Sequence, residues 1–365
     1  MPFRNKNKKF IEFSKNYISE KEYLLSEDNL FSVFKELEDE RVSDYHFEPE
    51  EKSVRVKIRF SGKIIEIKEM EKEKYDVLLN KLCIVSDIDP ISLYENTDSS
   101  VHYRNNNYRI SFINSINGIS CVIRKLKNIE NVEIELPDFL KKRLLENKIE
   151  SKVYIFSGPT GCGKTTTMSY IINKISEQYK IHTIENPVEY IIKNTVQIEI
   201  NRKNKNDILK NILRQDPDLI MPGEIRDSDF AKLLINAALT GHSVFATVHS
   251  KNVFSSLKRI ENLFEYKDPV NDILDIIVNQ RLVPIKCTKC GGKGCEYCYG
   301  TGTEKLSPVF EILEISHGIK FSEKDDIVRK NLYISPYEQL EKLKSENRIS
   351  DETFNKTLES FGVII

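Results

Sequence analysis

A glycine-rich segment at 158–167 has the spacing of a phosphate-binding loop, Gly-Pro-Thr-Gly-Cys-Gly-Lys-Thr-Thr-Thr. In such a loop, backbone N–H groups turn toward a polyphosphate, Lys164 would reach the β- and γ-phosphates, and the Thr165 hydroxyl would bind Mg²⁺. The residues expected to contact the nucleotide are Gly158, Pro159, Thr160, Gly161, Cys162, Gly163, Lys164, Thr165 and Thr166. The sequence therefore predicts a site for a nucleoside triphosphate.

The segments on either side of this loop support the prediction. Val153–Ser157 is an apolar run typical of a buried strand. The apolar positions after the loop recur at helical spacing: Met168, Ile171, Ile172, Ile175 and Tyr179. A helix N-terminus favours a bound anion because its first N–H groups have no partner within the helix. The alternative, a glycine-rich turn with a chance Lys-Thr pair, does not account for the order strand, loop, helix.

A second motif, Asp-Pro-Asp-Leu-Ile-Met-Pro-Gly-Glu-Ile-Arg-Asp, lies at 216–227. The apolar residues Leu219–Met221 predict a short strand that delivers Glu224 to its carboxyl end, the edge where open α/β sheets bind ligands. Glu224 could there orient and deprotonate the attacking water or complete the Mg²⁺ shell. In-line attack on a γ-phosphate requires both actions.

Two histidines flank a further predicted strand, with His242 before it and His249 at its end. Seven residues of extended chain span about 23 Å, so the two side chains cannot meet at one atom. A lone histidine is more often a structural hydrogen-bonding group than a catalyst. One of the two could still sense the γ-phosphate while the other faces a subunit border.

Four of the seven cysteines form two Cys-x₂-Cys pairs separated by four glycine-rich residues: Cys287, Cys290, Cys295 and Cys298. Four thiolates on two tight turns suit tetrahedral Zn²⁺. The alternatives are a reduced, metal-free cluster or disulfides, and we favour zinc for a cytosolic chain. Such a zinc would be structural, because four protein ligands leave no open coordination position.

Length and charge narrow the class of protein. A chain of 365 residues is too long for one compact core and suggests two or three domains. Charged residues make up 30% of the chain but nearly cancel, leaving a net charge of −1, so direct binding to nucleic acid is not expected. No apolar run approaches the roughly 18 residues of a membrane-spanning helix, and the first residues do not resemble a signal peptide. We expect a cytoplasmic protein.

The chain divides by pattern into six regions. Residues 28–127 have an α+β texture, with a helix around 30–37, a hairpin over 54–65 and a strand pair at 108–113 and 119–124. The expected regions are an N-terminal arm at 1–27, this α+β domain at 28–127, an acidic linker at 128–137, an α/β domain at 138–285, the tetracysteine motif at 286–302 and a helical region at 303–365. In the last region Leu340 and Leu343 would share one helix face.

Several motifs in order carry a resemblance to a known family. Beside the phosphate loop and Gly-Glu-Ile-Arg-Asp, the chain has Ile-Glu-Asn-Pro-Val-Glu at 184–189, Leu-Arg-Gln-Asp-Pro-Asp at 213–218, Ala-Leu-Thr-Gly-His at 238–242 and Gln-Arg-Leu at 280–282. Together they closely resemble the type II secretion and type IV pilus assembly ATPases of the GspE–PilB group, and in particular its compact competence-pilus members of the ComGA type.

The resemblance implies an architecture and partners. It implies a PAS-like first domain, a RecA-like ATPase domain and a ring of copies of the chain, usually a hexamer. It also implies ATP with Mg²⁺ as the fuel, and a polytopic membrane platform protein as the partner at the cytoplasmic face of the plasma membrane. The machine so powered would assemble a pilus, as in competence, or secrete proteins by the type II route.

The resemblance also implies roles for individual residues. Lys164, Thr165 and Glu224 match the Walker A and Walker B residues. The family's acidic box, histidine box and arginine fingers correspond to Glu185 and Glu189, to His242 and His249, and to Arg109 and Arg124. Asn186 stands where the acidic box has an aspartate, which places more weight on the two glutamates.

Two other classes of function remain open at this point. A RecA-type motor that moves nucleic acid could also carry zinc knuckles, but the neutral net charge and the lack of interleaved aromatic and basic residues argue against it. A nucleotide-gated platform protein with negligible turnover would not need Glu224 and both histidines.

Overall fold

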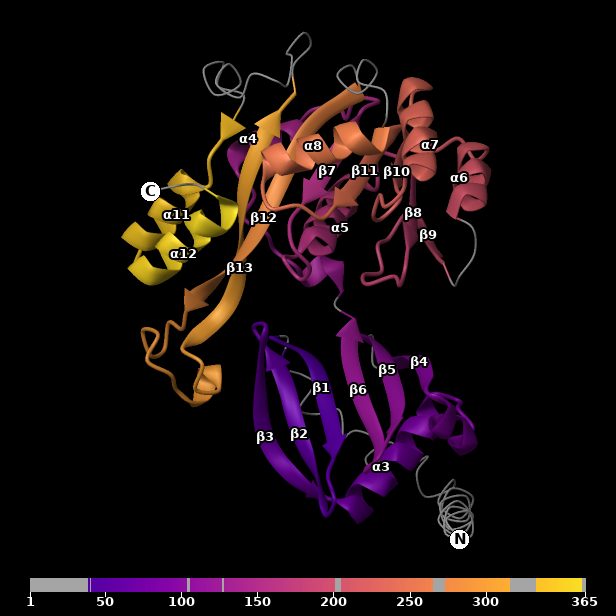
Figure 1. The fold of residues 1–365 in the computed structure, drawn as a ribbon, viewed down its shortest axis with the longest axis vertical. Helices are drawn as coiled ribbons and strands as arrows, with labels where there is room; N and C mark the ends of the chain where they lie inside the picture. Colours follow the sequence, from indigo (N-terminus) through magenta and orange to yellow (C-terminus); the bar gives the residue numbers. More distant parts are fainter. Residues whose placement is uncertain are drawn as a thin grey trace. The chain divides into compact units, whose positions relative to one another are not determined.

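A computed structural model describes residues 39, 41–103, 106–126, 128–200, 205–264, 273–315 and 333–362 (Figure 1). The chain forms two compact units, Met1–Lys127 and Asn128–Ile365, each with its own sheet. The N-terminal arm expected at 1–27 and the helix expected around 30–37 lie outside the described residues.

The first unit is built on a six-stranded antiparallel sheet in the order β3-β2-β1-β6-β5-β4. Its elements are β1 (Val42–Pro49), β2 (Ser53–Phe60), β3 (Lys63–Glu71), α3 (Lys72–Val85), the short 3₁₀ helix η2 (Pro90–Glu95), β4 (Thr97–Tyr103), β5 (Asn106–Ser115) and β6 (Gly118–Leu126). Along β2 every second residue is buried, so the period-two pattern of the sequence places one face of the sheet in the core.

Both strand pairs expected in this unit are confirmed. The β2–β3 hairpin turns at Ser61 and Gly62, whose φ angles of 45° and 82° suit a two-residue turn that matches strand twist. Helix α3 covers the sheet with Tyr75, whose ring stacks on Phe47 at 5.7 Å and whose hydroxyl donates to the carbonyl of Ile119. The helix and the sheet thereby share one core.

The second unit contains an eight-stranded sheet in the order β14-β13-β12-β7-β11-β10-β8-β9. Its strands are β7 (Val153–Ser157), β8 (Ile181–Glu185), β9 (Thr195–Glu199), β10 (Leu219–Met221), β11 (Ser243–Val248), β12 (Leu274–Lys286), β13 (Thr303–Glu314) and β14 (Tyr333–Ile334). The run from β12 to β9 is parallel, whereas β13 and β14 pair antiparallel. The carboxyl ends of parallel strands lie at one edge of the sheet, which is the edge where open α/β sheets bind ligands.

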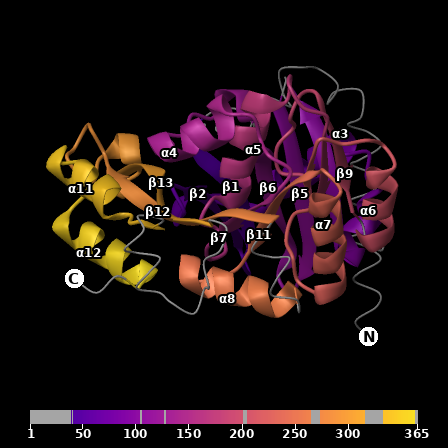
Figure 2. The same cartoon turned by 90° about the horizontal axis from the view of Figure 1, so that it is seen from above.

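Helices cover both faces of this sheet (Figure 2). They are α4 (Asp138–Lys141), the π-helix η4 (Lys142–Glu146), α5 (Lys164–Ile175), α6 (Lys205–Leu213), α7 (Ser228–Leu239) and α8 (Val253–Phe264). Apolar residues of α6, α7 and α8 pack on one face, and those of α4, η4 and α5 pack on the other. Strands buried on both faces explain the continuous apolar run of β7.

The strands β12 and β13 form a long ribbon whose tip carries the cysteine loop with the short helix η5 (Glu296–Cys298) (Figure 1). Helices α11 (Tyr337–Ser345) and α12 (Asp351–Phe361) pack on this ribbon. Leu340 and Leu343 are both buried, as expected from the helical spacing. The region 303–365 is not helical throughout, however, because 303–314 is strand β13.

Two further details differ from the sequence prediction. Helix α5 ends at Ile175, before Tyr179. Tyr179 nevertheless packs against the same core from the turn that follows, and its hydroxyl accepts from the N–H of Ile149. The acidic segment 128–137 packs on the second unit, with Ile129 and Leu136 in its core and a 3₁₀ turn, η3, at Ile129–Asn131. Among the described residues no helix is long and apolar enough to cross a bilayer.

Candidate nucleotide and metal sites

The phosphate-type loop joins β7 to α5, as the sequence predicted. Its three glycines have φ angles of 140°, 77° and 86°, which only glycine adopts without strain. A Cβ at Gly158 would also come within 2.6 Å of both the Cys162 Sγ and the Gln280 carbonyl oxygen. The loop is therefore pressed closely against β12, and a larger residue does not fit at Gly158.

Lys164 is held inside this loop. Its Nζ donates to the carbonyls of Gly158 at 2.8 Å and Pro159 at 3.0 Å, and the residue is 8% exposed. Burial lowers the pKa of Lys164, because the charged ammonium loses its water. The first N–H groups of α5 face the same region, so an anion there would meet both an ammonium and a helix N-terminus.

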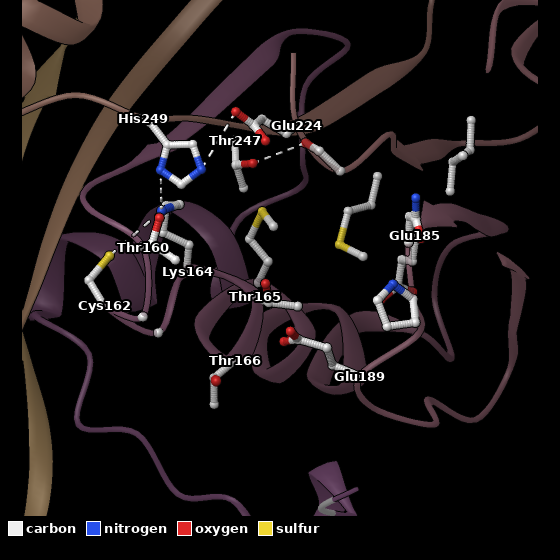
Figure 3. A pocket seen from close by; sticks show the side chains of 18 of the residues that line it. Thr160, Cys162, Lys164, Thr165, Thr166, Glu185, Glu189, Glu224, Thr247 and His249 are labelled. Carbon is white, nitrogen blue, oxygen red and sulfur yellow. Dashed lines mark hydrogen bonds and ion pairs between the residues drawn. The ribbon is translucent and has the colours of Figure 1, made fainter. Parts of the chain in front are cut away.

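A cavity of about 500 Å³ opens in front of the loop (Figure 3). It is lined by Thr160, Gly161, Cys162, Gly163, Lys164, Thr165, Thr166, Met168, Ile184, Glu185, Asn186, Pro187, Glu189, Lys205, Met221, Gly223, Glu224, Arg226, Thr247, His249 and Leu282. Six stretches that are separated in the sequence thus meet at the carboxyl edge of the sheet, the place that open α/β sheets use for ligands. The volume suits a ligand of nucleotide size.

Glu224 follows β10 and pairs with Thr247 through an isolated β-bridge, which fixes its backbone beside β11. Its two carboxylate oxygens have different neighbours. Oε2 accepts from Arg226 Nε at 2.7 Å, and Oε1 lies 3.5 Å from His249 Nε2 (Figure 3). The carboxylate is thus held on two sides at the mouth of the phosphate loop.

His249 connects this carboxylate to the loop. Its Nδ1 lies 3.2 Å from the Gly158 carbonyl oxygen and 3.4 Å from Lys164 Nζ. A carbonyl can only accept and an ammonium can only donate, so Nδ1 is protonated when it bonds to Gly158 and unprotonated when it accepts from Lys164. In the second case Nε2 carries the proton toward the Glu224 carboxylate. His249 therefore stands between the lysine that would meet the phosphates and the acid that would act on water.

The two glutamates of the predicted acidic box also line the cavity. Glu185 is 6% exposed, and its Oε1 accepts from the Thr183 hydroxyl at 2.8 Å and the Gln197 amide at 3.1 Å. Burial raises the pKa of Glu185, against the effect of these two bonds. With Glu189 and the Thr165 hydroxyl it supplies hard oxygen groups of the kind that Mg²⁺ and its waters prefer.

Three predicted site residues lie elsewhere. His242 does not line the described cavity, and its Nδ1 bonds to the carbonyl of Ala237 at 2.9 Å, at the end of α7. Arg109 and Arg124 belong to the first unit, where they are paired across β5 and β6. There Arg124 Nε donates to the buried Asp44 at 2.7 Å, and Arg59 Nε lies 3.6 Å from the same carboxylate.

The sequence did not single out Lys205 or Arg226 as pocket residues. Lys205 begins α6, and its Nζ lies 5.6 Å from the centre of the Phe230 ring. Burial lowers the pKa of Lys205, and the positive charge of Arg226 lowers it further. Arg226 stands within the Gly-Glu-Ile-Arg-Asp motif, so its position was readable, but nothing in the pattern places Lys205 near the loop.

The four cysteines meet at the tip of the ribbon, where their ligand atoms lie within 4.8 Å of one another. The Sγ–Sγ distances are 3.9 Å for Cys287–Cys295, 3.9 Å for Cys290–Cys298 and 3.7 Å for Cys295–Cys298. Sulfurs bound 2.3 Å from a central ion at tetrahedral angles lie about 3.8 Å apart. A disulfide needs about 2.05 Å, so the arrangement fits a tetrahedral metal and not disulfides.

Comparison with known proteins identifies relatives of this chain. Among curated relatives, the type IV pilus assembly ATPase PilB of Thermus thermophilus is 31% identical over 323 residues, covering 76% of this chain and 36% of PilB. A putative type II secretion system protein E of Escherichia coli is 30% identical, covering 74% of this chain and 59% of the relative. The competence protein ComGA of Bacillus subtilis is 29% identical, covering 78% of this chain and 85% of ComGA. The chain thus spans about a third of the length of PilB and about three fifths of the length of the Escherichia coli protein.

Solved structures have a similar fold over nearly the whole chain. The pilus retraction motor PilT with bound ADP has a TM-score of 0.66 at 24% identity, covering 91% of this chain and 96% of PilT. The ATPase DotB of Legionella pneumophila has a TM-score of 0.69 at 18% identity, covering 91% and 95%. The family model described as "Type II/IV secretion system protein" matches residues 22–359. The chain therefore belongs to the type II/IV secretion system protein family, as its motifs indicated.

Proposed function

We propose that this chain is an ATPase that powers type IV pilus assembly of the competence kind, or type II secretion. The observation that carries the proposal is the convergence of Lys164, Glu224 and His249 on one cavity at the edge of a parallel sheet. The curated relatives PilB and ComGA support the biological role, since both are named for pilus or competence functions.

The residues suit in-line attack on a γ-phosphate. Lys164 would leave the Gly158 and Pro159 carbonyls to bind the β- and γ-phosphates. Glu224 would orient the attacking water and take its proton, and His249, in contact with both, would sense whether the γ-phosphate is present. When bound, Mg²⁺ neutralises charge on the phosphate oxygens. The Thr165 hydroxyl would hold it, with Glu185 and Glu189 accepting from its waters.

Arg109 and Arg124 would complete the site as arginine fingers when the first unit closes over the nucleotide. The support is their adjacency on one sheet and the bond from Arg124 to buried Asp44, which orients the guanidinium. Arg124→Ala in the full chain should lower kcat about 10³-fold or more while nucleotide affinity changes little. Near-normal kcat in Arg109→Ala and Arg124→Ala alike would end this part of the proposal.

The proposal extends to architecture, location and partners. The antiparallel sheet with α3 supports a PAS-like first domain, and the parallel sheet with the phosphate loop supports a RecA-like second domain. We infer a hexameric ring at the cytoplasmic face of the plasma membrane, acting on a polytopic platform protein without touching nucleic acid. We infer also a structural zinc on Cys287, Cys290, Cys295 and Cys298.

Replacing Glu224 by glutamine tests the proposed activity. The amide keeps the shape of the side chain but cannot take a proton, so hydrolysis should fall by about two orders of magnitude or more while ATP binding remains. Phosphate release and binding of a fluorescent ATP analogue would be measured on the same preparation. Turnover near that of the unaltered chain would contradict the assignment, and hydrolysis that needs DNA would favour a nucleic-acid motor.

A further inference from the structure

Gln280 lies beneath the phosphate loop without lining the cavity. It belongs to β12, which pairs with β7 so that Asn279 stands opposite Ser157, the last residue before the loop. The side chain of Gln280 is 2% exposed, and both ends of its carboxamide are used. Nε2 donates to the Cys162 carbonyl at 2.7 Å, and Oε1 accepts from the Thr167 hydroxyl at 2.8 Å.

The contact between Gln280 and the loop is close on several sides. A Cβ added at Gly163 would come within 2.9 Å of Gln280 Nε2, and one at Gly158 within 2.6 Å of its carbonyl oxygen. Thr167, the second partner, is 0% exposed and lies in the first turn of α5. One amide thus joins the middle of the loop to the start of the helix that follows it.

The bond to Cys162 decides the direction of a peptide group. A trans peptide places its carbonyl and its N–H on opposite sides, so a Cys162 carbonyl turned toward Gln280 points the Gly163 N–H away from Gln280. Gly163 lines the cavity, so that N–H is directed to the side where phosphates would bind. In the reversed orientation the carbonyl oxygen would face the phosphates and repel them.

The loop needs such a support. Glycines lose more backbone entropy than other residues on being fixed, and three of the loop's residues are glycines. A loop that fluctuated between peptide orientations would bind nucleotide with an affinity reduced by the fraction of time spent in the wrong one. A buried, doubly bonded amide removes that loss before the ligand arrives.

We propose that Gln280 is a positioning residue for nucleotide binding, which fixes the Cys162–Gly163 peptide so that its N–H faces the phosphates. This inference rests on the proposed function, because it requires the cavity to bind nucleotide. It assigns Gln280 no contact with the nucleotide and no part in the chemical step. Its effect should therefore appear in the affinity for ATP and ADP alike, and in KM more than in kcat.

Gln280→Met tests the inference in the full chain, because methionine has a similar length and volume but neither bond. The dissociation constants of fluorescent ATP and ADP analogues should each rise about tenfold, the equivalent of about 1.4 kcal/mol. KM should rise by a similar factor, whereas kcat should change much less. Gln339→Met is the matched control. Gln339, on α11, also makes two hydrogen bonds, to the N–H and carbonyl of Phe310, but it neither lines the cavity nor bonds to the phosphate loop.

Thr167→Val is a second test of the inference, and it does not depend on whether Gln280→Met folds. It removes the hydroxyl bond alone, should weaken both analogues by less than Gln280→Met does, and should be rescued by Thr167→Ser. Unchanged affinities in Gln280→Met and Thr167→Val, beside a melting temperature lowered as in Gln339→Met, would overturn the inference and leave a purely structural role. If the unaltered chain bound neither analogue, the proposed function itself would fail, which is a different result.

Discussion

The phosphate loop and the cysteine loop are both short, glycine-rich turns, but their conformations have different origins. The phosphate loop is held by side chains from distant strands, Gln280 from β12 and His249 from the end of β11. The cysteine loop is held by its own backbone. The N–H of Gly294 donates to Cys290 Sγ, and those of Cys295 and Gly302 donate to Cys298 Sγ.

The difference shows what each loop depends on. The phosphate loop has its shape because the sheet places three strands side by side, so changes remote in sequence should alter it. The cysteine loop stands at the tip of a two-stranded ribbon and is held by bonds within the loop, so its stability should come from the metal and these local bonds. A substitution that abolishes nucleotide binding at the phosphate loop should therefore leave zinc binding at the cysteine loop intact, and the reverse should also hold.

Lys164→Ala should have the largest effect on the first loop and none on the second. It removes the ammonium expected to bind the phosphates, and affinity for a fluorescent ATP analogue should fall by about two orders of magnitude. The zinc content of the same preparation, measured by metal analysis, should remain at one equivalent per chain. A variant that lost zinc together with nucleotide binding would show that the two loops are not independent.

Cys290→Ser should do the reverse. With three thiolates left, zinc content should fall below about half an equivalent, and the melting temperature should drop, because metal binding contributes directly to folding. The dissociation constant of the ATP analogue should stay within about threefold of the unaltered value. A chain purified with adequate zinc that held no metal even with all four cysteines would exclude the zinc site.

The same contrast explains what the sequence could predict. The strand at 153–157, the strand at 219–221 and the hairpin around Ser61 were readable, because local pattern decides them. Both Cys-x₂-Cys pairs were readable for the same reason. Gln280 appeared in the sequence only as part of a family motif, because its contact with the loop depends on β12 lying beside β7.

Lys205 was missed for a related reason, since a single lysine at a helix start gives no signal of a neighbour some forty residues earlier. The predicted end of α5 was wrong, because Tyr179 continues the helical spacing of apolar residues in the sequence but lies in the turn after the helix. His242 matched a family motif, yet its ring bonds to the end of α7. Motif and spacing therefore identify residue types well, and only the strand order shows which of them meet.

Glu185→Gln should give the smallest effect, and the size of that effect depends on pH. Burial raises the pKa of Glu185, so the folded chain binds this proton more tightly than the unfolded chain does. Its charge therefore costs stability above the folded pKa, and the cost disappears as pH falls to the ordinary glutamate range near about 4.3. A glutamine Oε1 can still accept from Thr183 and Gln197.

At pH 8 the variant should thus melt a few degrees higher than the unaltered chain, and this difference in melting temperature should shrink as the pH is lowered. Hydrolysis should fall if the carboxylate of Glu185 serves the Mg²⁺ shell. Exposed Glu177→Gln removes the same charge without burial and should show no such pH-dependent gap. A Glu185→Gln melting temperature below the unaltered one at pH 8 would mean that the charge has a stabilising partner in the folded chain. A buried charge that lowers stability is expected at the phosphate-binding edge of the sheet, because oxygen groups there must bind a cation. It is not expected in the cysteine loop, which is held by local bonds.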